Sequence, residues 1–283
     1  MNYEVKNHPK FGESLYADNG TIEVIIPLTF GIRIGHFSLI GGENVFFEQP
    51  KDMTDLSTPD GWRVHCGHRM WLAPEGEHDY YPDNEPISYE IIDEDKILLT
   101  QKKDPWLKAR KRMLVSFGRE EDGEQERLTV MHSVENTGEE EMEVALWAIS
   151  AMAPCGVERI PMKKYTDGFF PRHQFSTWHY TNLGDERAKY SHEEITLTHT
   201  QIEQKFKIGI GHPCGKVTYE NRGVTFSVDY LIEEDEHYPD GEVSYETFMC
   251  AHMVEMETLS PLFKIAPGAI AEHCEVWELK ENK

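Results

Sequence analysis

The sequence predicts an all-β protein built from large antiparallel sheets, and two patterns support this fold class. Most of the chain consists of short runs in which apolar and polar residues alternate with period two, as they do in half-buried strands. No segment keeps the spacing of an amphipathic helix for more than about two turns. Because each half-buried strand needs an apolar partner surface, we expect one sheet to pack on another.

The strands of the first half are bounded by turn residues. Runs rich in β-branched and aromatic residues predict strands at residues 21–27, 31–40, 45–47, 88–92, 96–101, 109–117, 127–135 and 142–150. Gly and Pro separate the early strands, and acidic turns separate the later ones. The segment Asn136-Thr137-Gly138 lies between the last two and predicts a β-hairpin.

The second half repeats this organisation. Strands are expected at residues 196–200, 206–210, 216–220, 223–230, 242–250, 254–259, 262–265 and 271–279. Two stretches, 51–86 and 154–192, are irregular and contain Pro, Gly and many aromatic residues. Long irregular stretches in compact domains are often functional loops. No repeat or low-complexity linker divides the chain, so we expect a single domain over residues 1–283.

Charge and cysteine content narrow the class of partner and the compartment. The net charge is −23, from 28 Lys and Arg against 51 Asp and Glu, which argues against binding nucleic acid or an anionic membrane surface. No apolar run approaches the roughly 18 residues of a membrane span, and residues 1–8 show no signal-peptide core. The five cysteines lack any Cys-x-x-Cys spacing. Free thiols in a reducing cytoplasm fit this pattern, so a cytoplasmic location is expected.

The strand at residues 254–259 carries two carboxylates on one face. At period two, Glu255 and Glu257 point to one side, and Val254, Met256 and Thr258 point to the other. Such a face is either an exposed acidic surface of an acidic protein or part of a binding site. The next segments end at Ala266, Pro267 and Gly268, which form a tight corner before the last strand.

Several segments resemble one superfamily when they are taken in order. They are HRMWLAPE (68–75), YYPDNE (80–85), YPDG (238–241), VEMETLSP (254–261), APG (266–268) and EVWEL (275–279). Together they resemble the galactose mutarotase-like superfamily, in its little-characterised members of similar length, over residues 21–279. The resemblance implies a β-supersandwich in which a sugar binds in a cleft across one concave sheet.

The resemblance also implies a catalytic base. The Glu-Met-Glu-Thr segment is similar to the strand that carries the base of aldose 1-epimerases, and that role falls on Glu257. These enzymes have a histidine acid on another strand, but the matching residues 144–150 contain Trp147 and no histidine. Anomer interconversion needs an acid for the ring oxygen as well as a base. We expect His68 to be this acid, with His173 as the second candidate.

The candidate sugar-binding residues combine aromatic platforms with side chains that bond hydroxyl groups. They are Arg69, Trp71, Glu75, Trp147, His173, Trp178, Asp240 and Glu255, with Tyr80, Tyr81, Asp83 and Tyr180 as extensions. Alternatively, Trp71 and Trp178 close the ends of the sandwich, and Asp240 serves as a turn residue. Packing roles are expected for Trp62, Trp106 and Trp277.

Other chemistries have weaker support. His65, Cys66 and His68 offer metal-ligating atoms, but no second group completes a tetrahedral set, so no metal and no cofactor is predicted. No nucleophile elbow, phosphate loop or dinucleotide fingerprint is present. Lys207 could contact an anionic substituent, although blocking of a sheet edge is the preferred interpretation.

The sequence therefore predicts a carbohydrate-binding protein whose cleft is lined by residues 62–85, 165–180 and 255–257. An aldose 1-epimerase-like reaction is the leading hypothesis. The alternatives are a non-catalytic sugar-binding or sensing protein and another enzyme of the anomeric centre, such as a glycoside hydrolase. A hydrolase would need a second carboxylate about 5–10 Å from the first, and Glu255 is available.

Overall fold

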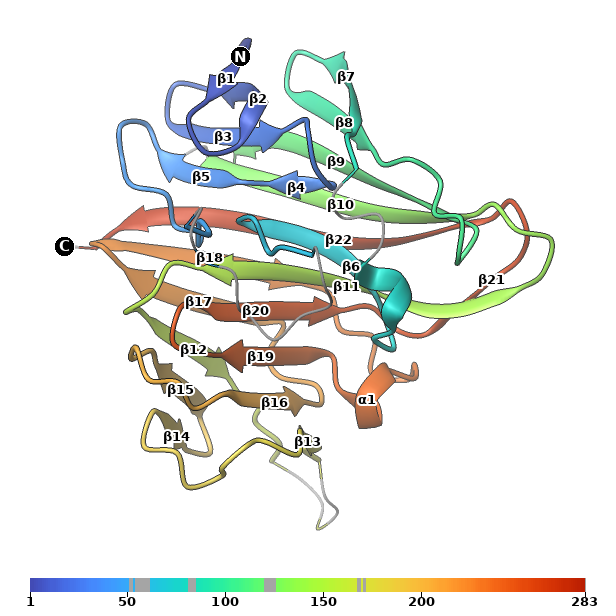
Figure 1. The fold of residues 1–283 in the computed structure, drawn as a ribbon. Coiled ribbons are helices and arrows are strands. Elements are labelled where there is room, and N and C mark those ends of the chain that lie inside the picture. The colour runs from blue at the N-terminus through green and yellow to red at the C-terminus, as the bar shows by residue number, and fades with distance from the viewer. Residues whose placement is uncertain are drawn as a thin grey trace.

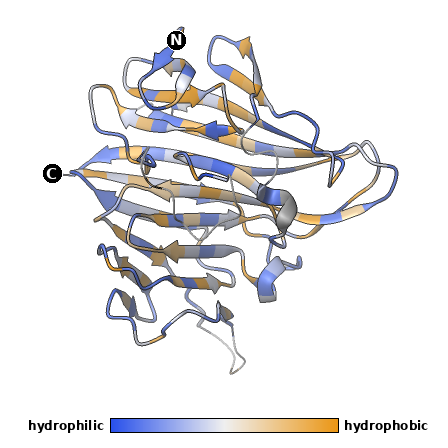
Figure 2. Ribbon diagram, in the orientation of Figure 1, coloured by the Kyte–Doolittle hydropathy of each residue, from blue (hydrophilic) through white to orange (hydrophobic). Residues whose placement is uncertain are grey.

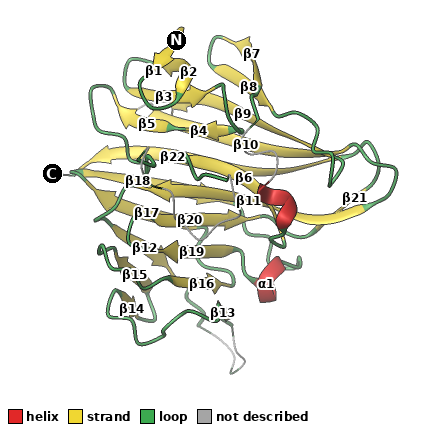
Figure 3. Cartoon of the chain, in the orientation of Figure 1, coloured by secondary structure: helices red, strands yellow, loops and turns green. Residues whose placement is uncertain are grey.

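The structure is almost entirely β (Figure 3). It is a computed structural model that describes residues 1–50, 53, 62–80, 85–119, 126–166, 169 and 172–282. In these residues the only helical elements are the 3₁₀ helix η1 (Glu77–Tyr80) and the short helix α1 (Pro239–Glu242). None of them is long and apolar enough to cross a membrane. The predicted fold class is confirmed.

The largest sheet has ten antiparallel strands and forms one layer of the molecule (Figure 1). In spatial order they are β14 (Ala188–Tyr190), β15 (Glu194–Thr198), β12 (Val157–Pro161), β17 (Lys216–Asn221), β18 (Val224–Tyr230), β22 (Ile270–Glu281), β10 (Glu126–Asn136), β9 (Ala109–Arg119), β8 (Lys96–Thr100) and β7 (Ser88–Asp93). Burial alternates along β9 and β10, which gives the period-two pattern of the sequence (Figure 2).

Two smaller sheets face this layer. The eight-stranded sheet runs β13 (Phe175–Thr177), β16 (Phe206–Ile210), β19 (Tyr245–Met249), β20 (Val254–Leu259), β11 (Met142–Met152), β6 (His68–Ala73) and β4 (Arg33–Ile34), with β21 (Phe263–Ile265) paired to β11. The four-stranded sheet runs β1 (Asn2–His8), β2 (Gly12–Asp18), β3 (Ile22–Pro27) and β5 (His36–Leu39).

One hydrophobic cluster joins the three sheets. It includes Val24 and Phe37 of the four-stranded sheet, Val130 and Trp277 of the ten-stranded sheet, and Met256 of the eight-stranded sheet. Trp277 is fully buried, and its ring centroid lies 5.5–5.6 Å from those of three phenylalanines, including Phe37. The predicted packing of sheet on sheet is therefore correct, and Trp277 is at its centre.

The hairpin predicted at residues 136–138 is wrong. β10 ends at Asn136 and pairs with β9 and β22, whereas β11 belongs to the eight-stranded sheet. The Asn136 side chain accepts a hydrogen bond from the Gly138 amide and donates to the carbonyls of Glu140 and Ile265. This turn carries the chain from one layer to the other, a choice that local turn chemistry does not decide.

The irregular stretches also contain strands. β6 lies within residues 51–86, and β12, β13 and β14 lie within residues 154–192. All six residues of β6 are buried, so its sequence has no alternation to detect. Residues 2–8 and 12–18 form β1 and β2, which were not predicted from the sequence. In the strand predicted at residues 45–47, only Phe46 makes a bridge, with Met152.

We expect Trp277→Ala to lower the free energy of unfolding by about 3–5 kcal/mol, because a large side chain is removed from the shared core. Trp106→Ala is the matched control, since that side chain is 68% exposed and should change stability by no more than about 0.5 kcal/mol. Urea unfolding followed by circular dichroism measures both. Equal losses in the two variants would contradict a core centred on Trp277.

Candidate functional site

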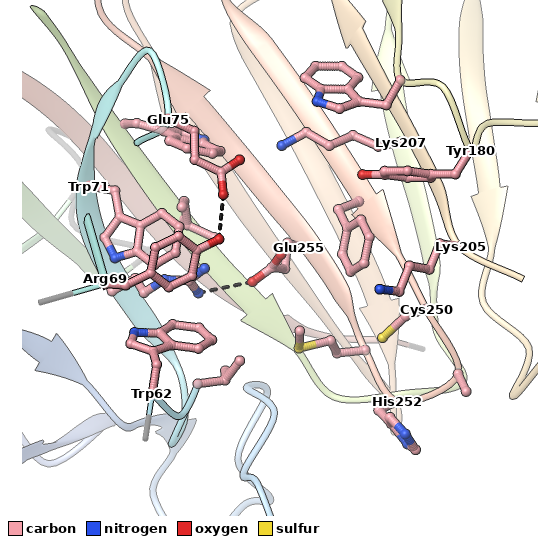
Figure 4. Close-up of a pocket in the computed structure, with 18 of the residues that line it drawn as sticks. Trp62, Arg69, Trp71, Glu75, Tyr180, Lys205, Lys207, Cys250, His252 and Glu255 are labelled. Carbon is pink, nitrogen blue, oxygen red and sulfur yellow. Dashed lines mark hydrogen bonds and ion pairs between the residues drawn. The ribbon is translucent and has the colours of Figure 1, made fainter. Parts of the chain in front are cut away.

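A cavity of about 360 Å³ lies on the face of the eight-stranded sheet that points away from the shared core. Its wall combines charged residues such as Arg69, Lys207 and Glu255 with aromatic side chains, which are Trp62, Trp71, Tyr80, Trp147, Trp178, Tyr180 and Phe248. Figure 4 shows Trp62, Arg69 and Trp71 on one side and Tyr180 and Lys207 on the other, with Glu255 between them. The volume falls within the range of about 300–1,000 Å³ typical of small-molecule sites.

Strand register explains why the charged side chains meet. Residues opposite one another across antiparallel strands share a face, and one such row runs Arg69, Ile149, Glu257, Glu246 across β6, β11, β20 and β19. Met256 and Thr258 alternate with the glutamates of β20 and point into the core or toward the opposite sheet. The two-sided character predicted for residues 254–259 is correct.

Arg69 and Glu255 form a pair on the cavity floor. The Arg69 Nη1 atom lies 2.9 Å from Glu255 Oε1, and the guanidinium lies 4.5 Å from the centroid of the Trp71 ring. The Trp62 ring lies 5.6 Å away. Both charged side chains are almost buried, so the interpretation of this face as an exposed acidic surface is wrong. The pairing offsets the cost of removing the two charges from water.

Lys207 forms ion pairs with two further glutamates. Its Nζ atom lies 2.8 Å from Glu257 Oε2 and 2.8 Å from Glu246 Oε2. Trp147 Nε1 also donates to Glu257 Oε2, at 2.8 Å. The ammonium lies 4.6 and 4.7 Å from the ring centroids of Trp147 and Trp178. Lys207 and Trp147 line the cavity directly, so Glu257 lies immediately behind its surface.

The environment shifts the protonation equilibria of all three groups. Burial raises the pKa of Glu257, and the negative charge of Glu255 raises it further, although Lys207 opposes both effects. Burial likewise raises the pKa of Glu246. Burial alone would lower the pKa of Lys207, but the two carboxylates raise it well above its usual value. The lysine therefore stays charged while its partners are easily protonated.

His68 lies on the opposite face of the sheet from the cavity. Its ring is fully buried between the layers, with Nδ1 2.8 Å from Ser150 Oγ and Nε2 2.7 Å from His132 Nε2. The expectation that His68 shares a site with Glu257 is not met. Successive side chains of a strand point to opposite faces, and Arg69 occupies the cavity side.

The buried histidines form the one group of possible metal ligands among the described residues. Ligand atoms of His68, His132 and Glu275 lie within 4.8 Å of one another. His132 Nδ1 bonds the His273 carbonyl, and Glu275 accepts hydrogen bonds from Thr258 and Trp277. If His132 Nδ1 carries its proton, His68 Nε2–H can donate to His132 Nε2. Hydrogen bonds within the protein therefore satisfy these atoms without an ion.

His173 and Asp240 also lie outside the cavity wall. The His173 ring packs edge-on against Tyr165, with 5.5 Å between centroids. Asp240 is exposed, has a φ of 53°, and its carbonyl accepts a hydrogen bond from Ser176. Neither residue lines the cavity. Asp240 is a turn residue, as the alternative interpretation of the sequence expected. Tyr81 and Asp83 lie outside the described residues.

Several cavity residues were not assigned to the site from the sequence. Trp62 has the packing role expected for it, in a buried cluster with Trp71 and Trp147, and it lines the cavity as well. Lys205, Phe248, Cys250 and His252 also line the cavity. The edge-blocking interpretation of Lys207 is wrong, since β16 lies between β13 and β19 and the side chain is buried. A lysine between Phe206 and Ile208 in a short apolar strand was the available signal.

Lys207→Met should lower the free energy of unfolding by about 3–5 kcal/mol at pH 8, because it leaves two buried carboxylates without a cation. A carboxyl group whose folded pKa is raised binds more protons in the folded state, so stability falls as pH rises above the usual value of 4.5. The loss should therefore be smaller at pH 5. Urea unfolding at both pH values measures it.

Lys264→Met is the control for that experiment. The Lys264 side chain is 67% exposed, and its removal should cost no more than about 0.5 kcal/mol at either pH. A pH-independent loss in Lys207→Met would mean that the carboxylates do not depend on the ammonium.

Comparison with known proteins places the fold. No protein-family model and no curated sequence matches this chain. The structure is similar to a galactose mutarotase-like protein from Lactobacillus casei (TM-score 0.61, 11% identity, 94% of this chain and 100% of that chain). It is also similar to a galactose mutarotase related enzyme from Lactobacillus acidophilus (0.58, 11%, 95% and 99%).

A candidate aldose 1-epimerase from Escherichia coli K12 is similar as well (TM-score 0.60, 12% identity, 94% of this chain and 98% of that chain). At these identities the similarity concerns the arrangement of the strands. The chain therefore has the galactose mutarotase-like fold, which confirms the fold that the sequence motifs implied.

Proposed function

We propose that the protein binds a carbohydrate in the aromatic cavity and interconverts its anomers, as an aldose 1-epimerase does. The observation that carries this proposal is the Lys207–Glu257 ion pair, in which Lys207 lines the aromatic cavity and Glu257 lies directly behind Lys207. The structural similarity to a candidate aldose 1-epimerase supports it. So does the position of Glu257, on which the resemblance places the base.

The cavity wall suits a sugar ring. The apolar C–H faces of a pyranose pack against indole and phenol rings, and its hydroxyl groups need donors and acceptors at the ring edge. Arg69 and Glu255 supply both on the floor. At the rim, Tyr80 donates to Glu75 with an O–O distance of 2.5 Å, which places another donor and acceptor side by side.

Glu257 is the proposed base. Its Oε1 atom is buried and has no hydrogen-bond partner among the described residues, whereas Oε2 is bound to Lys207 and Trp147. In this proposal the unpaired Oε1 takes the proton of the anomeric hydroxyl. The raised pKa of Glu257 makes it a stronger base than an exposed glutamate.

The reaction balances with one proton taken and one given. As the base removes the O1–H proton, the C1–O1 bond becomes a carbonyl and the C1–O5 electron pair moves to O5, which receives a proton. Rotation about C1–C2 and ring closure reverse these steps on the other carbonyl face. An ammonium has three N–H donors, and two of those of Lys207 meet carboxylates. The third can bond O5.

The test is a proton NMR time course on freshly dissolved α-glucose, α-galactose, uronic acids and sugar phosphates. Wild-type protein should speed the approach to anomeric equilibrium for at least one of them. Glu257→Gln should slow that reaction about 10²- to 10⁴-fold, because it removes the base. Glu143→Gln, an exposed substitution on β11, should leave the rate unchanged.

A full rate in Glu257→Gln would exclude this residue as the base, and Glu255→Gln then tests its neighbour. Saturation transfer to one sugar without any acceleration would instead assign the protein to the non-catalytic sugar-binding class.

Trp178→Ala should weaken binding of the same sugar about 2- to 12-fold, which corresponds to the roughly 0.5–1.5 kcal/mol of an aromatic contact. Isothermal titration calorimetry measures the change, and Trp106→Ala, far more exposed and outside the cavity wall, serves as the control. Unchanged affinity in Trp178→Ala would remove this side chain from the binding surface.

A further inference from the structure

The charges around Lys207 do not balance when every group is ionised. Two carboxylates, Glu246 and Glu257, share one ammonium, so the cluster would carry a net charge of −1. Both glutamates are only 1% exposed. A buried excess charge is costly, and the usual remedy is that one of the groups takes up a proton.

Strand register forces the two carboxylates together. Glu246 on β19 and Glu257 on β20 are directly opposite one another and therefore share the cavity face. Each has an oxygen 2.8 Å from the same Nζ atom. Both Glu246 oxygens lack a well-aligned hydrogen bond, as does Glu257 Oε1, so the ammonium does not satisfy the pair.

The surrounding groups do not supply the missing positive charge. Arg69 on β6 is held by Glu255, 2.9 Å away, and those two charges cancel. Asp240 in α1 adds negative charge near Glu246, and Glu158 lies behind the sheet, bonded to Tyr245 and Thr247. Tyr180 and Trp147 are neutral. Lys207 is thus the only ammonium within ion-pair distance of the two carboxylates among the described residues.

We propose that Glu246 and Glu257 hold one proton between them at neutral pH, and that Glu246 is the positioning residue that sets the protonation state of Glu257. The raised pKa of both carboxyl groups, caused first by burial, supports the same assignment. Two carboxylates that share a site cannot both ionise readily, and their titration belongs to the pair.

The shared proton can serve as the acid for the ring oxygen, in place of the histidine that residues 144–150 lack. This assignment rests on the proposed function. When the pair accepts the O1–H proton, it releases the proton it already holds to O5, as the C1–O5 electron pair moves to that oxygen. The pair then carries one proton before and after ring opening. Lys207 keeps its own proton, because its pKa is raised by its two partners.

The first test does not depend on activity. In infrared difference spectra at neutral pH, the wild-type protein should show the carbonyl stretch of a protonated carboxylic acid from this pair. The band should disappear in Glu246→Gln and equally in Glu257→Gln, because the remaining carboxylate is then balanced by Lys207 and ionises.

Glu158→Gln is the matched control. It removes a buried carboxyl group of β12, in the ten-stranded sheet, which accepts hydrogen bonds from Tyr245 and Thr247 of β19, and burial raises its pKa to about 7. This substitution should leave the band of the Glu246–Glu257 pair in place. A band that persists in Glu246→Gln, or a wild-type spectrum in which neither glutamine substitution removes a band, would overturn the proposal even if the protein is an epimerase.

The second test is the pH profile of the anomerisation rate. Glu246→Gln removes a like charge, so the pKa of Glu257 should fall and the acidic limb of kcat/KM should move to lower pH. Glu246→Asp should restore the wild-type profile in part. A uniform loss of rate with an unmoved limb would reduce Glu246 to a structural role. If no sugar reacts, the infrared experiment still tests whether Glu246 and Glu257 share a proton.

Discussion

The central strands of the eight-stranded sheet are buried on both faces, and the arrangement of the cavity depends on this constraint. One face packs into the core shared with the ten-stranded sheet, where Trp277 lies. The other face is covered by aromatic side chains and carries charged groups. Every residue of β6 and of β20 is buried, so each charge placed on these strands must find a partner inside the protein.

Arg69 and Lys207 meet this requirement in different ways. Arg69 is matched by one carboxylate and stacks on an indole, which is a balanced arrangement. Lys207 is shared by Glu246 and Glu257 and leaves negative charge in excess. Buried ion pairs of this kind contribute little net stability compared with apolar packing. Their concentration around one cavity therefore favours a role in binding or chemistry over a role in holding the fold.

Trp147 lies on the strand where an aldose 1-epimerase would have its histidine acid, and this bears on the proposed chemistry. The resemblance to aldose 1-epimerases implies a histidine on the strand that corresponds to β11, and Trp147 occupies that strand here. Its indole N–H donates to Glu257 and its ring contacts Lys207. An indole does not release a proton at neutral pH, so the acid of an epimerase reaction must come from another group. The protein thus combines a familiar fold with its own set of polar contacts.

The sequence by itself determined the fold class, most strands after residue 87, and the face on which Glu255 and Glu257 lie. Period-two patterning is a local property, and the superfamily motifs are contiguous segments. Only the tertiary structure decided that Asn136 leads to a different sheet, that His68 faces the core, and that Glu246, Lys207 and Glu257 meet. Glu246 and Lys207 lie far from one another in sequence, and strand order and register set their contact. Neither is encoded in local patterning, because each depends on which strands pair across the whole chain.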